Sequence, residues 1–200
     1  MFSCTKPSFT SLVALVCIAA AGCAARVDTE EQVAESASAL SAKSVPAVPA
    51  ALAVPTGNKL AFFWDGEGVQ IYTCNATASG GYAWTFKAPE ANLFDKHHRV
   101  VGAHYAGPTW EALDGSTVVG SKLAAYTADA TAIPWLLLQA VSHTGDGRMS
   151  EVSYVQRLST NGGLAPASGC DADHLGAEAD VPYTATYYFY EADDAKGHCH

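Results

Sequence analysis

The feature that most limits the fold of this chain is a succession of short apolar segments, rich in aromatic and β-branched residues, that begins at Leu60. Gly, Asp, Asn and Pro separate these segments, which is typical of β-strands joined by turns. After Leu60 no stretch keeps the apolar period of a helix. The segments that we interpret as strands are residues 60–64, 69–74, 82–86, 100–105, 116–119, 122–126, 135–142, 151–158 and 183–190.

Alternation within these segments places successive side chains on opposite faces of a strand. In residues 183–190, Tyr187 and Phe189 fall on one face, and Tyr188 and Tyr190 fall on the other. The pattern predicts an all-β fold with a single domain of eight or nine strands, built as a β-sandwich or an irregular β-barrel. Of these two architectures we favour the sandwich. We interpret residues 65–68 as a hairpin turn between the first two strands.

The N-terminus carries the signs of an exported protein. Lys6 precedes an apolar run over residues 12–21, which is too short for a permanent membrane helix and is typical of a signal peptide. This run leads into Ala20-Ala21-Gly22-Cys23, which resembles the lipobox of bacterial lipoproteins. We therefore expect a lipid anchor on Cys23 and a location at the cell envelope. Secretion as a soluble protein, after cleavage near Ala24-Ala25, is the alternative.

These features divide the chain into four parts. Residues 1–22 are the expected lipoprotein signal peptide, and residues 23–45 form a flexible tether rich in Ala, Ser, Val and Glu with no aromatic residue. Residues 46–192 form the β domain, which is long enough for one hydrophobic core and too short for two. Residues 193–200 are a tail at the chain end that we expect to be disordered.

Charge excludes one class of partner. The formal net charge is -9, and removal of the leader takes away Lys6 and no acidic residue, so it moves from -9 to -10. A polyanion is repelled by such a field, and the chain has no cluster of Lys and Arg that could overcome the repulsion. We therefore expect no binding to nucleic acid. The only contact with a membrane that we expect is through the lipid anchor.

Cysteine usage predicts one disulfide bond. Of the six cysteines, two lie in the leader and Cys23 is the expected lipid site, which leaves Cys74, Cys170 and Cys199. Exported proteins form disulfides readily. We favour a bond between Cys74, at the end of a strand, and Cys170, in a Gly- and Asp-rich loop. Pairing of Cys170 with Cys199 is the alternative, because spacing alone does not decide connectivity.

The best candidate site is a run of functional side chains around a Gly-Pro turn. Trp110 could stack on a sugar ring or another flat ligand, with Tyr105 and Thr109 as further ligand-binding residues. His104 as base and Glu111 as acid are the candidate catalytic residues. The alternative is that His104 and Trp110 pack in the core, with their polar atoms bonded to the backbone.

Other polar groups are weaker candidates. His97 and His98 are adjacent, so on a strand they would face opposite sides, and we interpret them as part of an exposed turn. The acidic residues between 171 and 180 do not have the spacing of an EF-hand loop, and we predict no metal site. No cofactor motif is present. If Arg157 is buried, it needs a carboxylate partner, and Glu90 or Asp114 could supply it.

Several short motifs occur in an order that resembles one known family. They are residues 68–74, Trp84 with Phe86, and residues 88–91, 102–110, 114–116, 133–138 and 155–157. Together they resemble a secreted bacterial and fungal family catalogued as domain-of-unknown-function family number 3455, over residues 46–190. The resemblance implies no established activity. Some fungal relatives carry a malate dehydrogenase label, but this chain lacks the glycine fingerprint of a dinucleotide-binding fold.

The sequence thus favours a domain that binds a ligand or has a structural role at the cell envelope, rather than an enzyme. The candidate partners are a carbohydrate or another small ligand. The motifs of a serine nucleophile elbow, a zinc protease or a phosphate-cradling loop are all missing. The alternative function is a hydrolase or lyase that acts on an extracellular or cell-wall polymer.

Overall fold

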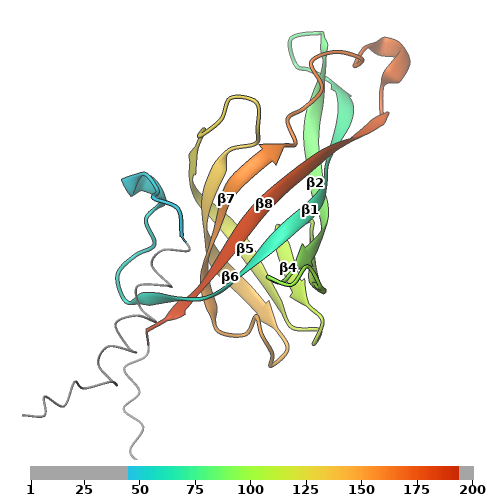
Figure 1. The fold of residues 1–200 in the computed structure, drawn as a ribbon. Coiled ribbons are helices and arrows are strands. Elements are labelled where there is room, and N and C mark those ends of the chain that lie inside the picture. Colours follow the sequence, from blue (N-terminus) through green and yellow to red (C-terminus); the bar gives the residue numbers. More distant parts are fainter. Residues whose placement is uncertain (1–44, 194–200) are drawn as a thin grey trace, which may run out of the picture. The chain divides into compact units, whose positions relative to one another are not determined.

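The computed structural model describes residues 45–193. The expected leader, Cys23, nearly all of the tether, Cys199 and the tail lie outside these described residues. Within them, no helix combines the length and the apolar character that a membrane crossing requires. The elements in Figure 1 are η1 (Ala50–Leu52), β1 (Asn58–Ala76), β2 (Tyr82–Phe94), β3 (Val100–Tyr105), β4 (Thr109–Ala112), β5 (Thr117–Tyr126), β6 (Trp135–Thr144), β7 (Val152–Gly162), η2 (Ala172–His174) and β8 (Glu178–Ala192).

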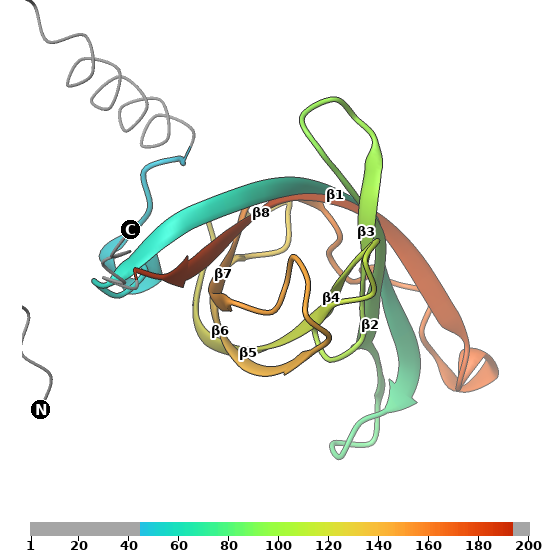
Figure 2. The same ribbon diagram turned by 90° about the horizontal axis from the view of Figure 1, so that it is seen from below.

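The eight strands form one antiparallel sheet that closes into a barrel. Each strand pairs with the next along the chain, and β8 pairs with both β7 and β1. Viewed from the end of the barrel, the strands form a ring (Figure 2). The all-β, single-domain prediction is confirmed, and the architecture is the barrel rather than the sandwich that we favoured. Closure leaves the sheet without the two free edges that a sandwich layer would have.

The expected hairpin at residues 65–68 is wrong, because β1 runs through this segment without a turn. Gly66 lies under the ring of Tyr187, where an added Cβ would come within 2.6 Å of a ring carbon. Gly68 faces the backbone of β2, and a Cβ there would lie 2.1 Å from the carbonyl oxygen of Glu90. These glycines therefore allow close packing inside a strongly bent strand. Likewise, the two segments expected at 116–119 and 122–126 form the single strand β5, with register shifts between Val119 and Gly120 and between Lys122 and Ala124.

Large side chains fill the end of the barrel that is covered by the loop between β6 and β7, and we call this end the base. Phe62, Trp64 and Phe189 pack together in the principal core cluster. The loop between β6 and β7 covers this end, with Met149 fully buried and the Arg148 guanidinium 4.0 Å from the centre of the Phe62 ring. One end of the barrel is therefore sealed by protein.

A second cluster lies on the outside of the barrel, under the segment that precedes β1. Leu52 is completely buried there against Leu137, Leu158 and Tyr188. Gln156 ties the segment to the wall: its Nε2 donates to the carbonyl of Leu52 at 2.7 Å, and its Oε1 accepts from the Tyr190 hydroxyl at 2.8 Å. The sheet is consequently buried on both faces in this region, which explains the continuous apolar run of β6.

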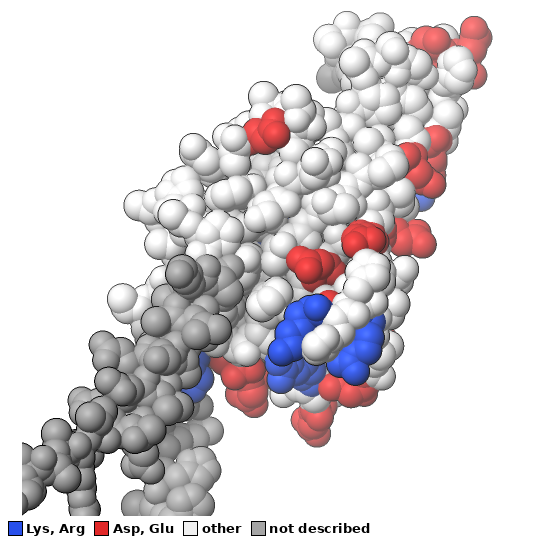
Figure 3. Space-filling model, viewed as in Figure 1, with Lys and Arg blue, Asp and Glu red and all other residues white. Residues whose placement is uncertain are grey.

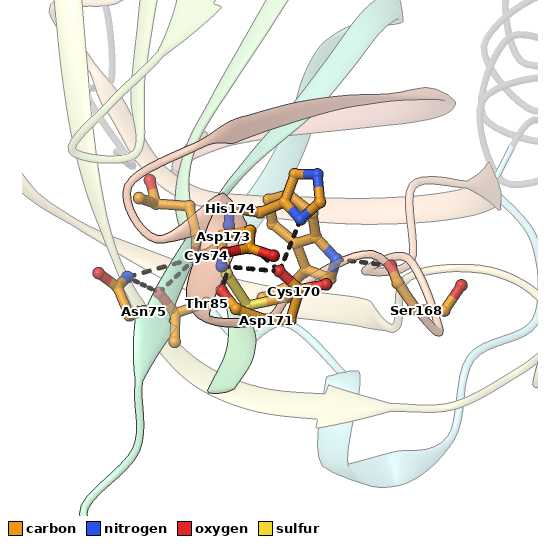
Figure 4. The surroundings of a disulfide bond; sticks show 10 residues. Cys74, Asn75, Thr85, Ser168, Cys170, Asp171, Asp173 and His174 are labelled. Carbon is orange, nitrogen blue, oxygen red and sulfur yellow. Dashed lines mark hydrogen bonds and ion pairs between the residues drawn. A yellow bond between two sulfur atoms is a disulfide. The ribbon is translucent and has the colours of Figure 1, made fainter. Parts of the chain in front are cut away.

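At the opposite end, β1, β2 and β8 extend beyond the barrel as an arm (Figure 1). The disulfide between Cys74 and Cys170 joins the arm to the loop that precedes β8, and this confirms the pairing that we favoured. Figure 4 shows the surroundings of this bond, with Ser168 and Asp171 on either side of Cys170 in the loop. The Trp84 indole on β2 donates to the carbonyl of Ser168 at 2.9 Å. The long loop is thus held against the arm by a covalent bond and by hydrogen bonds.

Candidate functional site

The barrel has a cavity of about 600 Å³ at the end opposite the sealed base. Strands from all sides of the barrel contribute to it, and so do the turn between β3 and β4 and the residues before β6. Its walls are mainly aromatic and aliphatic, with a small number of polar groups. The lining residues are Gln70, Tyr72, Phe86, Lys87, Pro89, His104, Ala106, Gly107, Pro108, Trp110, Lys122, Ile133, Pro134, Leu136, Leu138, Arg157 and Tyr187.

His104 forms part of the cavity wall and is 3 % exposed. Its ring stacks on Trp110, with ring centres 4.6 Å apart, and also contacts Tyr187. Nδ1 lies 2.8 Å from the carbonyl oxygen of Thr109. Because that oxygen can only accept, Nδ1 carries the proton of the neutral ring. Burial lowers the pKa of His104 to about 3, against a smaller opposing effect of this hydrogen bond. The imidazole is therefore neutral at physiological pH.

Two buried hydrogen-bond donors in the cavity wall have no partner among residues 45–193. They are Nε1 of Trp110 and Nε2 of Gln70, on residues that are 1 % and 2 % exposed. Burial raises the pKa of Tyr183, and the nearby Gln70 amide lowers it by a smaller amount. The Nε2 atom of Gln70 nevertheless makes no hydrogen bond of normal geometry. The Trp110 indole N–H can only donate, so it needs an acceptor that the described residues do not supply. Buried donors without partners are rare in folded proteins.

Arg157 points into the cavity from β7, but it has no carboxylate partner among the described residues. Its Nε and Nη2 both donate to the carbonyl of Pro134, at 3.2 and 2.8 Å. The expected partners lie elsewhere. Asp114 accepts hydrogen bonds from Ser116 and from the backbone of Arg148, and Glu90 is an exposed residue of β2. The charge of Arg157 is instead surrounded by neutral phenols.

Those phenols are Tyr72, Tyr183 and Tyr187. Burial raises the pKa of each of them, and Arg157 acts in the opposite direction with a smaller effect. They are therefore protonated at neutral pH and offer no formal negative charge. The Tyr72 hydroxyl donates to the carbonyl of Gly163 at 2.6 Å, and the hydroxyls of Tyr183 and Tyr187 lie 3.0 Å apart. The region around Arg157 is therefore polar, with the hydroxyl groups of these tyrosines around one guanidinium.

The other site residues expected from the sequence divide between the two faces of the sheet. His104 pairs with Trp110 across β3 and β4, and both face the interior. Glu111 is the next residue along β4, so it faces the outside, where it accepts a hydrogen bond from the Tyr105 hydroxyl at 2.8 Å. His104 and Glu111 therefore cannot act together on one bond of a substrate. Thr109 is buried, and its hydroxyl donates to the carbonyl of Ala106.

The remaining polar candidates lie on the surface. His98 stacks on Phe94 in the turn after β2, and the backbone of His97 donates to the carboxylate of Asp95. Asp171 caps η2 by accepting from the backbone of Asp173 and His174. Within residues 45–193, no group of three or more His, Cys, Asp and Glu side chains is arranged to hold a metal ion.

The buried imidazole predicts a pH dependence of stability. The folded protein keeps His104 neutral down to a pH of about 3, whereas an unfolded chain protonates a histidine near pH 6.5. The unfolded state then binds more protons as the pH falls from 6.5 toward 3, so the stability contribution of His104 is present above this window and is lost within it. Urea unfolding at pH 7, 6, 5 and 4 should show wild type losing up to about 1.4 kcal/mol per pH unit relative to His104→Gln. A constant difference would contradict the burial of a neutral ring.

Comparison with known proteins adds a family but no activity. The family that matches is described as "Protein of unknown function (DUF3455)", and the match covers residues 55–191. Neither the comparison with curated proteins nor that with solved structures found a match. The matched range contains nearly the whole barrel, including every residue that lines the cavity. The chain therefore belongs to the DUF3455 family.

Proposed function

We propose that this domain is a binding protein that holds a small, partly apolar organic molecule in the barrel cavity. The observation that carries the proposal is the cavity itself, which is open at one end, has a volume of about 600 Å³ and contains a buried indole N–H without a partner. Cavities of this size suit drug-sized ligands, and an eight-stranded barrel has room for one such molecule.

The walls of the cavity support an apolar part of the ligand. Phe86, Pro134 and Leu136 line the cavity with apolar surface that is exposed or half-buried, and Trp110 and Tyr187 form part of the buried wall behind them. A ligand that covers these surfaces gains roughly 25 cal/mol for each Å² of apolar area removed from water. The few polar groups would then fix its orientation. This combination favours binding of a compact organic molecule over binding of a long, fully polar polymer.

The neutral fluorophore N-phenyl-1-naphthylamine tests the proposal. We expect the fluorescence of this probe to rise when it is mixed with the protein. Competing apolar molecules should displace the probe and lower the fluorescence again. Leu136→Trp would place an indole in the cavity and should weaken binding at least tenfold, which corresponds to about 1.4 kcal/mol. Leu113→Trp is the matched control, because Leu113 is 74 % exposed in the loop between β4 and β5. No fluorescence rise, or equal binding by both variants, would refute the proposal.

We further propose that the domain is displayed at the cell envelope through a lipid on Cys23. The support comes from the sequence alone, since the leader and Cys23 lie outside the described residues. Mass spectrometry of the mature protein made in a bacterial host should find a diacylglyceryl group on an N-terminal Cys23. An unmodified cysteine there would refute the anchor without affecting the binding proposal.

A further inference from the structure

We propose that the molecule bound in the cavity carries an anionic group, of the carboxylate or sulfonate class, that pairs with Arg157. This inference rests on the proposed function and specifies the chemistry of the ligand. It depends on three features of the part of the chain that the structure describes: a guanidinium without a counter-charge, a cavity lining without carboxylates, and a buried donor without an acceptor.

The guanidinium of Arg157 is the first feature. It is partly buried on β7, where burial lowers the pKa of the guanidinium, and its hydrogen-bond partners among the described residues are neutral: the carbonyl of Pro134 and the Tyr187 hydroxyl. The ion pairs found within residues 45–193 involve Lys59, Lys87, His98, Arg99 and His174, and none involves Arg157. A charge removed from water normally has a partner of opposite sign. A ligand anion would supply that partner.

The composition of the lining is the second feature. Asp and Glu outnumber Lys and Arg in the chain by 20 to 11, and acidic side chains are spread over the outer face in Figure 3. Even so, no residue that lines the cavity is acidic, whereas Lys87, Lys122 and Arg157 all line it. Lys87 pairs with Glu178 on the surface, but Lys122 forms no ion pair with any described residue. The charged residues that line the cavity are therefore all basic, although the protein as a whole is negative.

The buried donor is the third feature. Nε1 of Trp110 can only donate, and Nε2 of Gln70 adds a second donor. A carboxylate or sulfonate offers several lone pairs to such groups, while an ammonium ligand would offer none and would be repelled by Arg157. Phe86 and Leu136 also line the cavity, and their accessible apolar surface would contact the apolar part of the same ligand.

A matched pair of probes separates the anion from the apolar part. 1-Anilinonaphthalene-8-sulfonate has the aromatic skeleton of N-phenyl-1-naphthylamine and an added sulfonate. In 0.15 M salt, where repulsion by distant surface acids is largely screened, we expect wild type to bind the sulfonate at least tenfold more tightly, as a charge-assisted hydrogen bond requires. Arg157→Met should lower this preference to threefold or less and change binding of the neutral probe less than threefold, and Arg157→Lys should keep a larger part of the preference.

Two further variants provide a control and a second test of the preference for the sulfonate. Arg148→Met removes an arginine at the sealed base, outside the cavity, and should leave the preference intact. Lys122→Gln alters an exposed residue at the mouth and should lower the preference two- to threefold even if the Arg157 variants do not fold. Equal binding of both probes by wild type would overturn the anion inference and leave the proposed function standing. Binding of neither probe would overturn the proposed function itself.

Discussion

Replacing Cys74 and Cys170 by serine should lower the free energy of unfolding by about 4 kcal/mol. The two residues are 96 apart in sequence, so their bond greatly restricts the unfolded chain. In the folded state the backbone contacts near the bond do not depend on it: Cys74 N donates to the carbonyl of Ala177, and Gly176 N donates to the carbonyl of Cys74, both at 2.9 Å. The loss should therefore come mainly from the greater entropy of the unfolded chain.

Urea unfolding with and without a reducing agent measures this effect. Reduced wild type should match the double serine variant, and oxidised wild type should be more stable than both. Cys199→Ser is the control, because the structure joins Cys74 to Cys170 and the bond does not need Cys199. If Cys199→Ser alone produced a loss of about 4 kcal/mol, the cysteine pairing described above would be incorrect.

Phe189→Ala should destabilise the barrel by about 3–5 kcal/mol. Phe189 is fully buried on β8, its ring stacks on Phe62 at a centroid distance of 4.6 Å, and the edges of Trp64 and Trp110 contact it. Truncation leaves a cavity between the rings of Phe62 and Trp64 on the neighbouring strand β1 and the ring of Trp110 on β4, which does not pair with β1 or β8. These strands cannot move together to fill the space without breaking the closed sheet.

A comparison of a buried and an exposed phenylalanine tests whether the interior around Phe189 is tightly packed. Phe86 is 56 % exposed and contacts Tyr72 edge to face, so Phe86→Ala should cost about 1 kcal/mol or less. Phe189→Leu should fall between the two alanine variants, because leucine keeps part of the buried volume. Chemical denaturation of the three variants under one set of conditions gives the comparison. Similar losses for Phe86→Ala and Phe189→Ala would show that Phe189 does not lie in a tightly packed interior.

Local pattern was sufficient for much of the fold. Alternation along residues 183–190 correctly separated Tyr187 and Phe189, which face the interior, from Tyr188 and Tyr190, which pack in the outer cluster. This works because the side-chain period of a strand is a property of the local backbone. The sequence favours the disulfide between Cys74 and Cys170 but leaves Cys170 with Cys199 open, and the structure decides between the two pairings. Glycine was less informative: Gly66 and Gly68 suggest a turn by composition, but they serve close packing in the middle of β1.

Tertiary structure alone decided the cavity and the residues that meet in it. Gln70, Trp110 and Arg157 come from β1, β4 and β7, and nothing in their local sequence shows that they share an interior. Closure depends on the twist and register accumulated over eight strands, which no short segment encodes by itself. For the same reason, the sequence shows only that the run from His104 to Glu111 is rich in functional groups. The pairing of β3 with β4 places His104 and Trp110 inside the barrel and Glu111 outside it.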